Sequence, residues 1–376
     1  MLANRKHYFV LLILWLVVEA GLFIHNGIVT NGEAIPYIAE ANYFIANAAF
    51  TSAKSIFYSV YILLLALFKK TGFQSTGIYV LQVALNLYAM YCFFKLTHFV
   101  TKSFNAALLA TILLITCIPW QDWTTYLYTE SVFCSMVIIF SYSIFYSKNN
   151  GKKNIFLMVL SFLVLLFSRP TGLLFIPVVG LMLIYYYNKK KNFYGASLSL
   201  LTAGVFFLIL VNYAMRSGGE FDFMKPFRDE NILCYLATQT TSSNATIPPD
   251  GNSLQGLLHY VLNNPATFTK LAVLKFQSYW GLTRSYYSST HNALLICFFY
   301  PLYFFAAFGV IKLWQTTTVF VLYSLLIFFF FTLSVLVTCD DWSNRFIMPV
   351  LPFVILLGAY GISVVVKKLK AVSLKK

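Results

Sequence analysis

Two carboxylates and a phenol share one short stretch of the chain, NGEAIPYIAEANYF at residues 31–44. Glu33, Tyr37 and Glu40 are spaced i, i+4 and i+7, and on a helix this spacing places them on one face. A positioned carboxylate can take a proton from a reacting hydroxyl. The pattern therefore predicts a short helix that carries acid–base groups. The alternative is a solvated helix face without chemistry.

One acidic residue and one arginine each lie alone at the end of an apolar run. Glu130 opens the run that follows TTYLYT, and Arg169 lies between two runs in FSRPTGLLF. An ionisable side chain there is costly unless it faces a polar cavity, so each is a functional candidate. Arg169 has the forked donors that suit phosphate. The alternatives are a helix-dipole contact for Glu130 and a lipid-headgroup contact for Arg169.

A second charged group precedes the last apolar run, in DDWSNRFIMPVLPF at residues 340–353. Arg345 follows two acids, Asp340 and Asp341. The sequence leaves open whether Arg345 forms a structural ion pair with one of them or a second phosphate contact. Cys234 and Cys339 both fall in segments expected outside the membrane, so a disulfide between them is a hypothesis. No metal-ligand spacing, nucleotide loop or hydrolase motif is present.

These residues stand in a chain whose composition indicates a membrane protein. Hydrophobic residues make up 59 % of the 376 positions and charged residues 10 %, against about 25 % charged residues in soluble domains. The net charge of +15 comes from short lysine clusters between apolar runs, which is typical of cytoplasmic loops and not of a nucleic-acid site. We therefore expect no nucleic-acid partner.

Apolar runs long enough to cross a membrane predict about ten spans. They lie near residues 8–28, 77–98, 104–118, 127–147, 154–168, 172–187, 193–213, 292–311, 316–338 and 346–366. A further run at 55–68 is short for a span, and counting it as one would move two lysine clusters to the outside. We therefore expect it to lie in or dip into the outer leaflet, with both termini cytoplasmic.

This topology gathers most acidic residues on the extracytoplasmic side. We expect an all-α polytopic fold in three parts: a transmembrane module at 1–213 with an external loop at 29–76 that holds juxtamembrane helices, an external cap at 214–291, and C-terminal transmembrane helices at 292–376. The expected location is the plasma (inner) membrane, with the active site on the extracytoplasmic side.

Four motifs in this order resemble the GT-C superfamily of membrane glycosyltransferases, nearest to the bacterial branch of lipid A aminoarabinose transferases and protein O-mannosyltransferases. They are Glu33 with Tyr37 after the first span, Thr129-Glu130-Ser131 at the outer start of a later span, Arg169-Pro170-Thr171-Gly172, and Arg345-Phe346 with Pro349 and Pro352. The first acid is usually Asp in that family and is Glu33 here.

The resemblance implies a GT-C-like bundle that moves a sugar from a polyprenyl-phosphate donor to a lipid, glycan or protein acceptor, with inversion. It implies catalytic roles for Glu33, Glu40 and Glu130, with Glu33 favoured as base and Glu40 as support. Arg169 and Arg345 would bind the donor phosphate. Substrate contacts would come from Tyr37, Asp122, Tyr128 and Asp341. The implied partners are the donor, the acceptor and membrane lipids, and a divalent metal ion is a possible cofactor without assigned ligands.

Two other classes of protein remain as alternatives. A Wzy-like polymerase or ligase of lipid-linked glycans would also use external arginines, but it does not require Glu33. A flippase or transporter would place charges at the bilayer midplane, where only Glu19 qualifies. A structural hydrogen bond is the preferred interpretation of Glu19.

Overall fold

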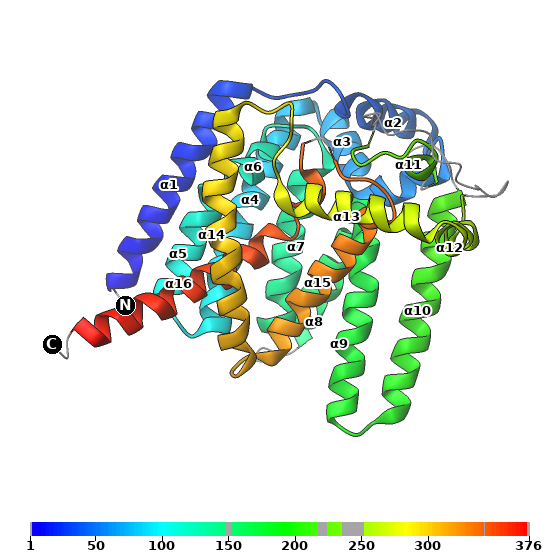
Figure 1. Ribbon diagram of the computed structural model, residues 1–376. Helices are drawn as coiled ribbons and strands as arrows, with labels where there is room; N and C mark the ends of the chain where they lie inside the picture. Colours follow the sequence, from blue (N-terminus) through cyan, green and yellow to red (C-terminus); the bar gives the residue numbers. More distant parts are fainter. Residues whose placement is uncertain (1, 147–151, 217–223, 235–251, 342, 374–376) are drawn as a thin grey trace. The chain divides into compact units, whose positions relative to one another are not determined.

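The computed structural model describes residues 2–146, 152–216, 224–234, 252–341 and 343–373 (Figure 1). These residues form helices, with two isolated β-bridges and no longer strand among them. Among these described residues, eight helices are long and apolar enough to cross a membrane. The chain therefore has the all-α, multi-pass architecture that the composition predicts.

The eight candidate spans fall within long helices or helical pairs. They are α1 (Leu2–Asn26), α4 (Gln74–Thr101), α7 (Thr129–Tyr146), the 3-10 helix η4 (Pro170–Leu174) with α9 (Phe175–Lys189), α10 (Phe193–Arg216), α14 (Ser289–Trp314), α15 (Thr318–Leu336) and α16 (Leu351–Ser373).

Two of the ten expected spans differ from simple crossings. The run at 104–118 is a broken pair, because α5 (Phe104–Ile115) is bent by 67° against the segment Ile118–Thr124. Pro119 explains the break, since a proline is tolerated in the first turn of a new helix but not inside a continuing one. The apolar part of α8 (Lys152–Ser168), Ile155–Ser168, is shorter than the other spans. The count of ten spans remains a prediction.

The loop after α1, which the sequence predicts to be external, folds into short helices. They are α2 (Ala34–Asn47), the 3-10 helix η1 (Ala53–Tyr58) and α3 (Ser59–Lys70). In Figure 1, α2 lies beside α3, and contacts join α2 to α3 and α3 to α4. The 12 residues of α3 are too few to cross the hydrocarbon core, so the run at 55–68 forms a short helix as expected.

Contacts divide the chain into two compact units. Unit 1 comprises 1–172, 301–321 and 351–376, and unit 2 comprises 173–300 and 322–350. This grouping does not follow the expected boundaries at 213/214 and 291/292, because α16 packs on α5 and α4 and so joins the N-terminal part. Part of the expected cap, residues 217–223 and 235–251, lies outside the described residues.

Within unit 1, α4 forms the centre of the bundle. It packs against α5, α7, α3 and α16, while α1 lies on α5. Figure 1 shows the first turns of α1 and the last turns of α16 at the end of this unit away from α2 and α3. The helices α2 and α3 therefore lie at the end of unit 1 opposite to the first turns of α1 and the last turns of α16.

Candidate functional site

Tyr37 on α2 is the centre of a charged cluster in unit 1. Its ring lies 5.3 Å from the ring of Tyr58 and 5.7 Å from that of Tyr61, measured between centroids. Burial raises the pKa of Tyr37 well above its ordinary value, and the nearby acids Glu130 and Glu33 raise it further while Arg169 opposes the rise. The phenol is thus protonated at neutral pH and can donate a hydrogen bond.

A buried ion pair belongs to this cluster. Arg169 Nη1 lies 2.5 Å from Glu130 Oε1, and the two side chains are 10 % and 1 % exposed. Two charges are taken out of water here, which is tolerated only when each compensates the other. The structure therefore brings together four of the predicted site residues: Glu33, Tyr37, Glu130 and Arg169.

Local sequence explains how Arg169 is held in place. A turn closes between Gly172 N and Arg169 O at 2.8 Å. A Cβ atom on Gly172 would lie 2.3 Å from Leu165 O, so only glycine permits this close backbone approach. The RPTG turn thus fixes the guanidinium at the end of α8 beside the start of α7.

The start of α2 is fastened to the segment before α7. Tyr128 Oη accepts a hydrogen bond from Glu33 N and donates one to Asn31 O, each at 3.2 Å. Gly32 has a φ of +59°, and a Cβ atom there would lie 2.4 Å from the same phenol oxygen. Glu33 directly precedes Ala34, the first residue of α2. Tyr128 therefore holds the backbone of Glu33 near the cluster.

Two predicted site residues lie elsewhere in unit 1. Glu40 accepts hydrogen bonds from the backbone N and the hydroxyl of Thr51, at 2.7 and 2.5 Å. Asp122 accepts a 2.6 Å hydrogen bond from Asn26 at the end of α1. Through these hydrogen bonds both side chains stabilise loops. No contact in the described structure joins either of them to Tyr37.

A buried polar ladder on α4 lies next to the cluster, and it was not predicted from the sequence. Gln82 accepts a 2.9 Å bond from the hydroxyl of Tyr61, and Asn86 accepts a 2.8 Å bond from Trp15 Nε1. Asn86 in turn donates to Gln121 at 2.9 Å. The spacing of Gln82 and Asn86, four residues apart in an apolar run, was the available signal.

Glu19 has the structural role that the sequence favoured. It is 4 % exposed within α1, and its Oε2 accepts a 2.8 Å hydrogen bond from the hydroxyl of Thr124. This bond joins α1 to the bent segment of unit 1. The transporter alternative stays a prediction that nothing in the structure tests.

Unit 2 contains a second buried group of charges. Arg345 Nη2 lies 2.7 Å from Asp341 Oδ2, and Arg284 Nη2 lies 2.6 Å from Asp340 Oδ2. All four side chains are at most 6 % exposed. Burial raises the pKa of Asp340, and the charge of Arg284 opposes this rise. The ion-pair alternative for Arg345 is thus realised, with Asp341 as the partner.

Arg284 is the residue of this group that the sequence analysis missed. Its Nη2 also donates to Asp341 O at 3.0 Å, so it contacts both acids. The chain has six arginines, and Arg284 is one of five that fall outside under the expected topology. An arginine against the positive-inside trend was the available signal.

A disulfide joins two distant segments of unit 2. Cys234 and Cys339, 105 residues apart, are bonded, as the sequence hypothesis allowed. Beside it, Cys234 N donates to Asp340 O at 2.8 Å and Asp340 N donates to Ile232 O at 2.9 Å. The disulfide therefore fixes the backbone that carries Asp340.

The residues present do not assign ligands to a metal ion. Among the described residues, no three histidine, cysteine or acidic side chains lie together in a way that could hold one. In the Tyr37 cluster, one Glu130 oxygen already lies against Arg169. Metal dependence stays a prediction.

Comparison with known proteins adds no family assignment. No family model and no curated protein matches the chain.

Proposed function

We propose that the protein is an integral membrane glycosyltransferase that moves a sugar from a polyprenyl-phosphate donor to an acceptor hydroxyl on the extracytoplasmic face. One observation carries the proposal: Glu33 and Tyr37 from the external loop lie with Glu130 and Arg169 in one cluster of unit 1. These residues come from three segments that are far apart in the sequence. A carboxylate that can accept a proton and an arginine that can bind a phosphate are the groups that this transfer requires.

Glu33 is the general base in this proposal. It is half-buried at the start of α2, so its carboxylate can reach an acceptor that enters from the aqueous side. The acceptor oxygen forms a bond with the anomeric carbon while its proton passes to Glu33. Such a positioned proton transfer contributes about 10²–10⁴-fold to the rate.

Arg169 stabilises the leaving group. The bond between the anomeric carbon and the phosphate oxygen breaks, and its electron pair leaves with the polyprenyl phosphate. A guanidinium carries five N–H donors in a fixed fork, so contact with Glu130 and contact with a phosphate are compatible. Glu130 holds the guanidinium in position, and preorganised charge of this kind is worth about 10²–10³-fold.

A single displacement at the anomeric carbon inverts its configuration. Tyr37 remains protonated and donates a hydrogen bond to the sugar or phosphate. Arg345 and Asp341 belong to unit 2, where they pair with each other. Their roles in phosphate and substrate binding remain predictions that Arg345→Met and Asp341→Asn variants test.

The experiment is donor turnover in nanodiscs. The purified protein is offered a panel of polyprenyl-phosphate sugars with short-chain alcohol, glycan and lipid acceptors, and the loss of each donor is followed by mass spectrometry. We expect one donor to be consumed, with an inverted anomeric linkage in the product by NMR. A retained linkage would refute the single displacement, and no consumption across the panel, with and without divalent metal, would refute the proposed class.

A further inference from the structure

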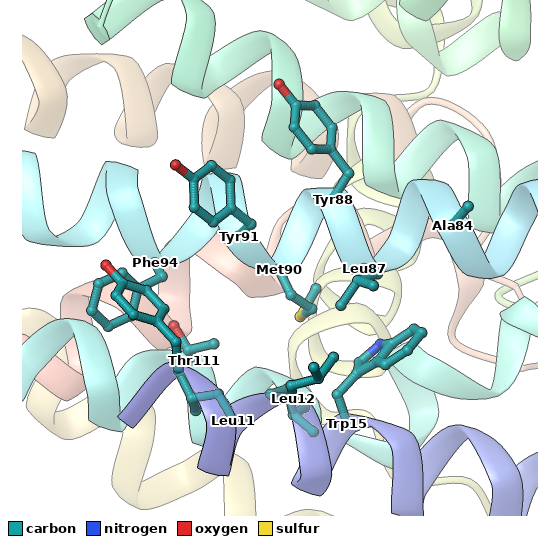
Figure 2. A pocket seen from close by; sticks show the side chains of 12 residues that line it. Leu11, Leu12, Trp15, Ala84, Leu87, Tyr88, Met90, Tyr91, Phe94 and Thr111 are labelled. Atoms are coloured by element: carbon teal, nitrogen blue, oxygen red, sulfur yellow. The ribbon is translucent and has the colours of Figure 1, made fainter. Parts of the chain in front are cut away.

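Unit 1 contains a cavity that the proposed reaction does not use. It has a volume of about 420 Å³, within the range of about 300–1,000 Å³ typical of ligand pockets. It lies between α1, α4 and α5, and Figure 2 shows its lining side chains. The lining consists of Tyr8, Leu11, Leu12, Trp15, Ala84, Leu87, Tyr88, Met90, Tyr91, Phe94, Thr111 and Ile115.

The cavity suits a hydrocarbon chain. Its wall is aliphatic and aromatic, with Thr111 and the phenol oxygens of the tyrosines as its few polar groups. Several wall residues, including Tyr91 and Leu87, are exposed at the bundle surface, so the cavity opens sideways. The indole N–H of Trp15 already donates a hydrogen bond to Asn86, so few groups in the wall can bind water. Apolar cavities of this kind stay dry.

A cation lies at the edge of the cavity. Lys95 Nζ is 5.8 Å from the ring centroid of Tyr8 and 5.5 Å from that of Tyr91, and both rings belong to the wall. Further basic side chains lie on the first turns of α1 and in the last turn of α4, namely Lys6, His7 and His98. This end of the cavity therefore favours an anionic group.

The length of α4 places this cation opposite the Tyr37 cluster. Lys95 follows Gln74, the first residue of α4, by 21 positions, which is about 32 Å at 1.5 Å per residue. The hydrocarbon core of a bilayer is about 30 Å thick. Because α4 begins just after α3 of the external loop, Lys95 lies near the other interface.

We propose that this cavity is a binding site for one acyl chain of an anionic phospholipid, with the headgroup at Lys95. Under the orientation proposed above, the lipid comes from the cytoplasmic leaflet; occupancy itself does not depend on the orientation or on the proposed reaction. A polyprenyl-phosphate donor is disfavoured here, because its phosphate would lie about one membrane thickness from Arg169 and Glu33.

The test measures lipid retention on the full chain by native mass spectrometry. Detergent-purified protein is titrated with phosphatidylglycerol and phosphatidylcholine of identical acyl chains, and with a polyprenyl phosphate. Ala84→Trp fills the cavity from α4, and Ala20→Trp is its matched control, because Ala20 is exposed on α1 but does not line the cavity. Lys95→Gln removes the cation, and Lys102→Gln removes an equal charge at the same end of α4.

We expect the wild type to retain one phosphatidylglycerol more than Ala84→Trp and to prefer it to phosphatidylcholine about fivefold, the effect of one lysine near a headgroup. Lys95→Gln should lose this preference, and both control variants should keep the wild-type pattern. Equal retention in Ala84→Trp, or a preference that survives Lys95→Gln, would overturn the proposal. Stronger, Lys95-dependent retention of the polyprenyl phosphate would also overturn it, because the occupant would then be a different lipid.

Discussion

The buried pair between Arg169 and Glu130 makes the sharpest link between structure and proposed chemistry. Arg169→Met leaves the Glu130 carboxylate, 1 % exposed, without its charge partner. Breaking a buried pair in this way costs about 3–5 kcal/mol. At about 2–4 °C per kcal/mol, the thermal midpoint in detergent should fall by roughly 6–20 °C. The thermal midpoint of Glu130→Leu alone should fall by a similar amount, because this variant leaves the buried guanidinium without its charge partner.

The double variant separates stability from function. Apolar replacement of both partners of a buried pair is often neutral or stabilising, so Glu130→Leu with Arg169→Met should regain most of the lost midpoint. Donor turnover should stay at least about 10²-fold below wild type, because the phosphate has lost its arginine.

The assay is a thermal melt followed by size-exclusion fluorescence, run beside donor turnover on the same samples. Recovery of turnover to within tenfold in the double variant would refute the role of Arg169 at the phosphate. Single variants with wild-type midpoints would refute the buried pair itself.

Three further predictions concern the elements around the sites. Replacing Cys234 and Cys339 by serine should lower stability by about 2–5 kcal/mol, and reductant should lower the wild-type melting midpoint in the same way; an unchanged midpoint would contradict the disulfide. Burial lowers the pKa of Lys275 to about 7, so the unfolded state binds more protons than the folded state between about pH 7 and pH 10.5, and stability should rise across that window. Lys275→Met should raise the midpoint at pH 7 and reduce this rise, and an identical pH profile in the variant would argue against the effect. Gly32→Ala should lower the free energy of unfolding by about 1–2 kcal/mol from its left-handed backbone alone. Adding Tyr128→Phe should restore part of any larger loss of stability, because it removes the oxygen that the new Cβ atom would meet. A wild-type melting midpoint for Gly32→Ala would contradict the close contact.

The helical, multi-pass fold followed from local features of the sequence. Apolar runs and lysine clusters are local patterns that one sequence displays directly. Most helices therefore lie where the apolar runs predicted them. The break after Ile115 was missed, although Pro119 in CIPWQD stood at the end of that run. A proline directly after an apolar run indicates a helix boundary, and treating 104–118 as one straight span overlooked it.

The candidate site was predictable in its residue types but not in its pairing. Glu130 and Arg169 stood out because an ionisable side chain in an apolar segment needs a partner. Their contact joins positions 39 residues apart, and a single sequence carries no signal for a pairing over that separation. Glu40 and Glu33 looked alike in the sequence. Only the folded loop shows that Glu40 fastens Thr51 while Glu33 lies beside Tyr37.

The measurement that tests the central claim most directly is donor turnover by Glu33→Gln, with Glu40→Gln on α2 as the matched control. Both variants remove one carboxylate from the segment between α1 and α3 and conserve the size of the side chain. If Glu33 is the general base, Glu33→Gln should lose about 10²–10⁴-fold in turnover, while Glu40→Gln should stay within about tenfold of wild type. Wild-type turnover in Glu33→Gln, with folding intact by thermal melt, would contradict the account.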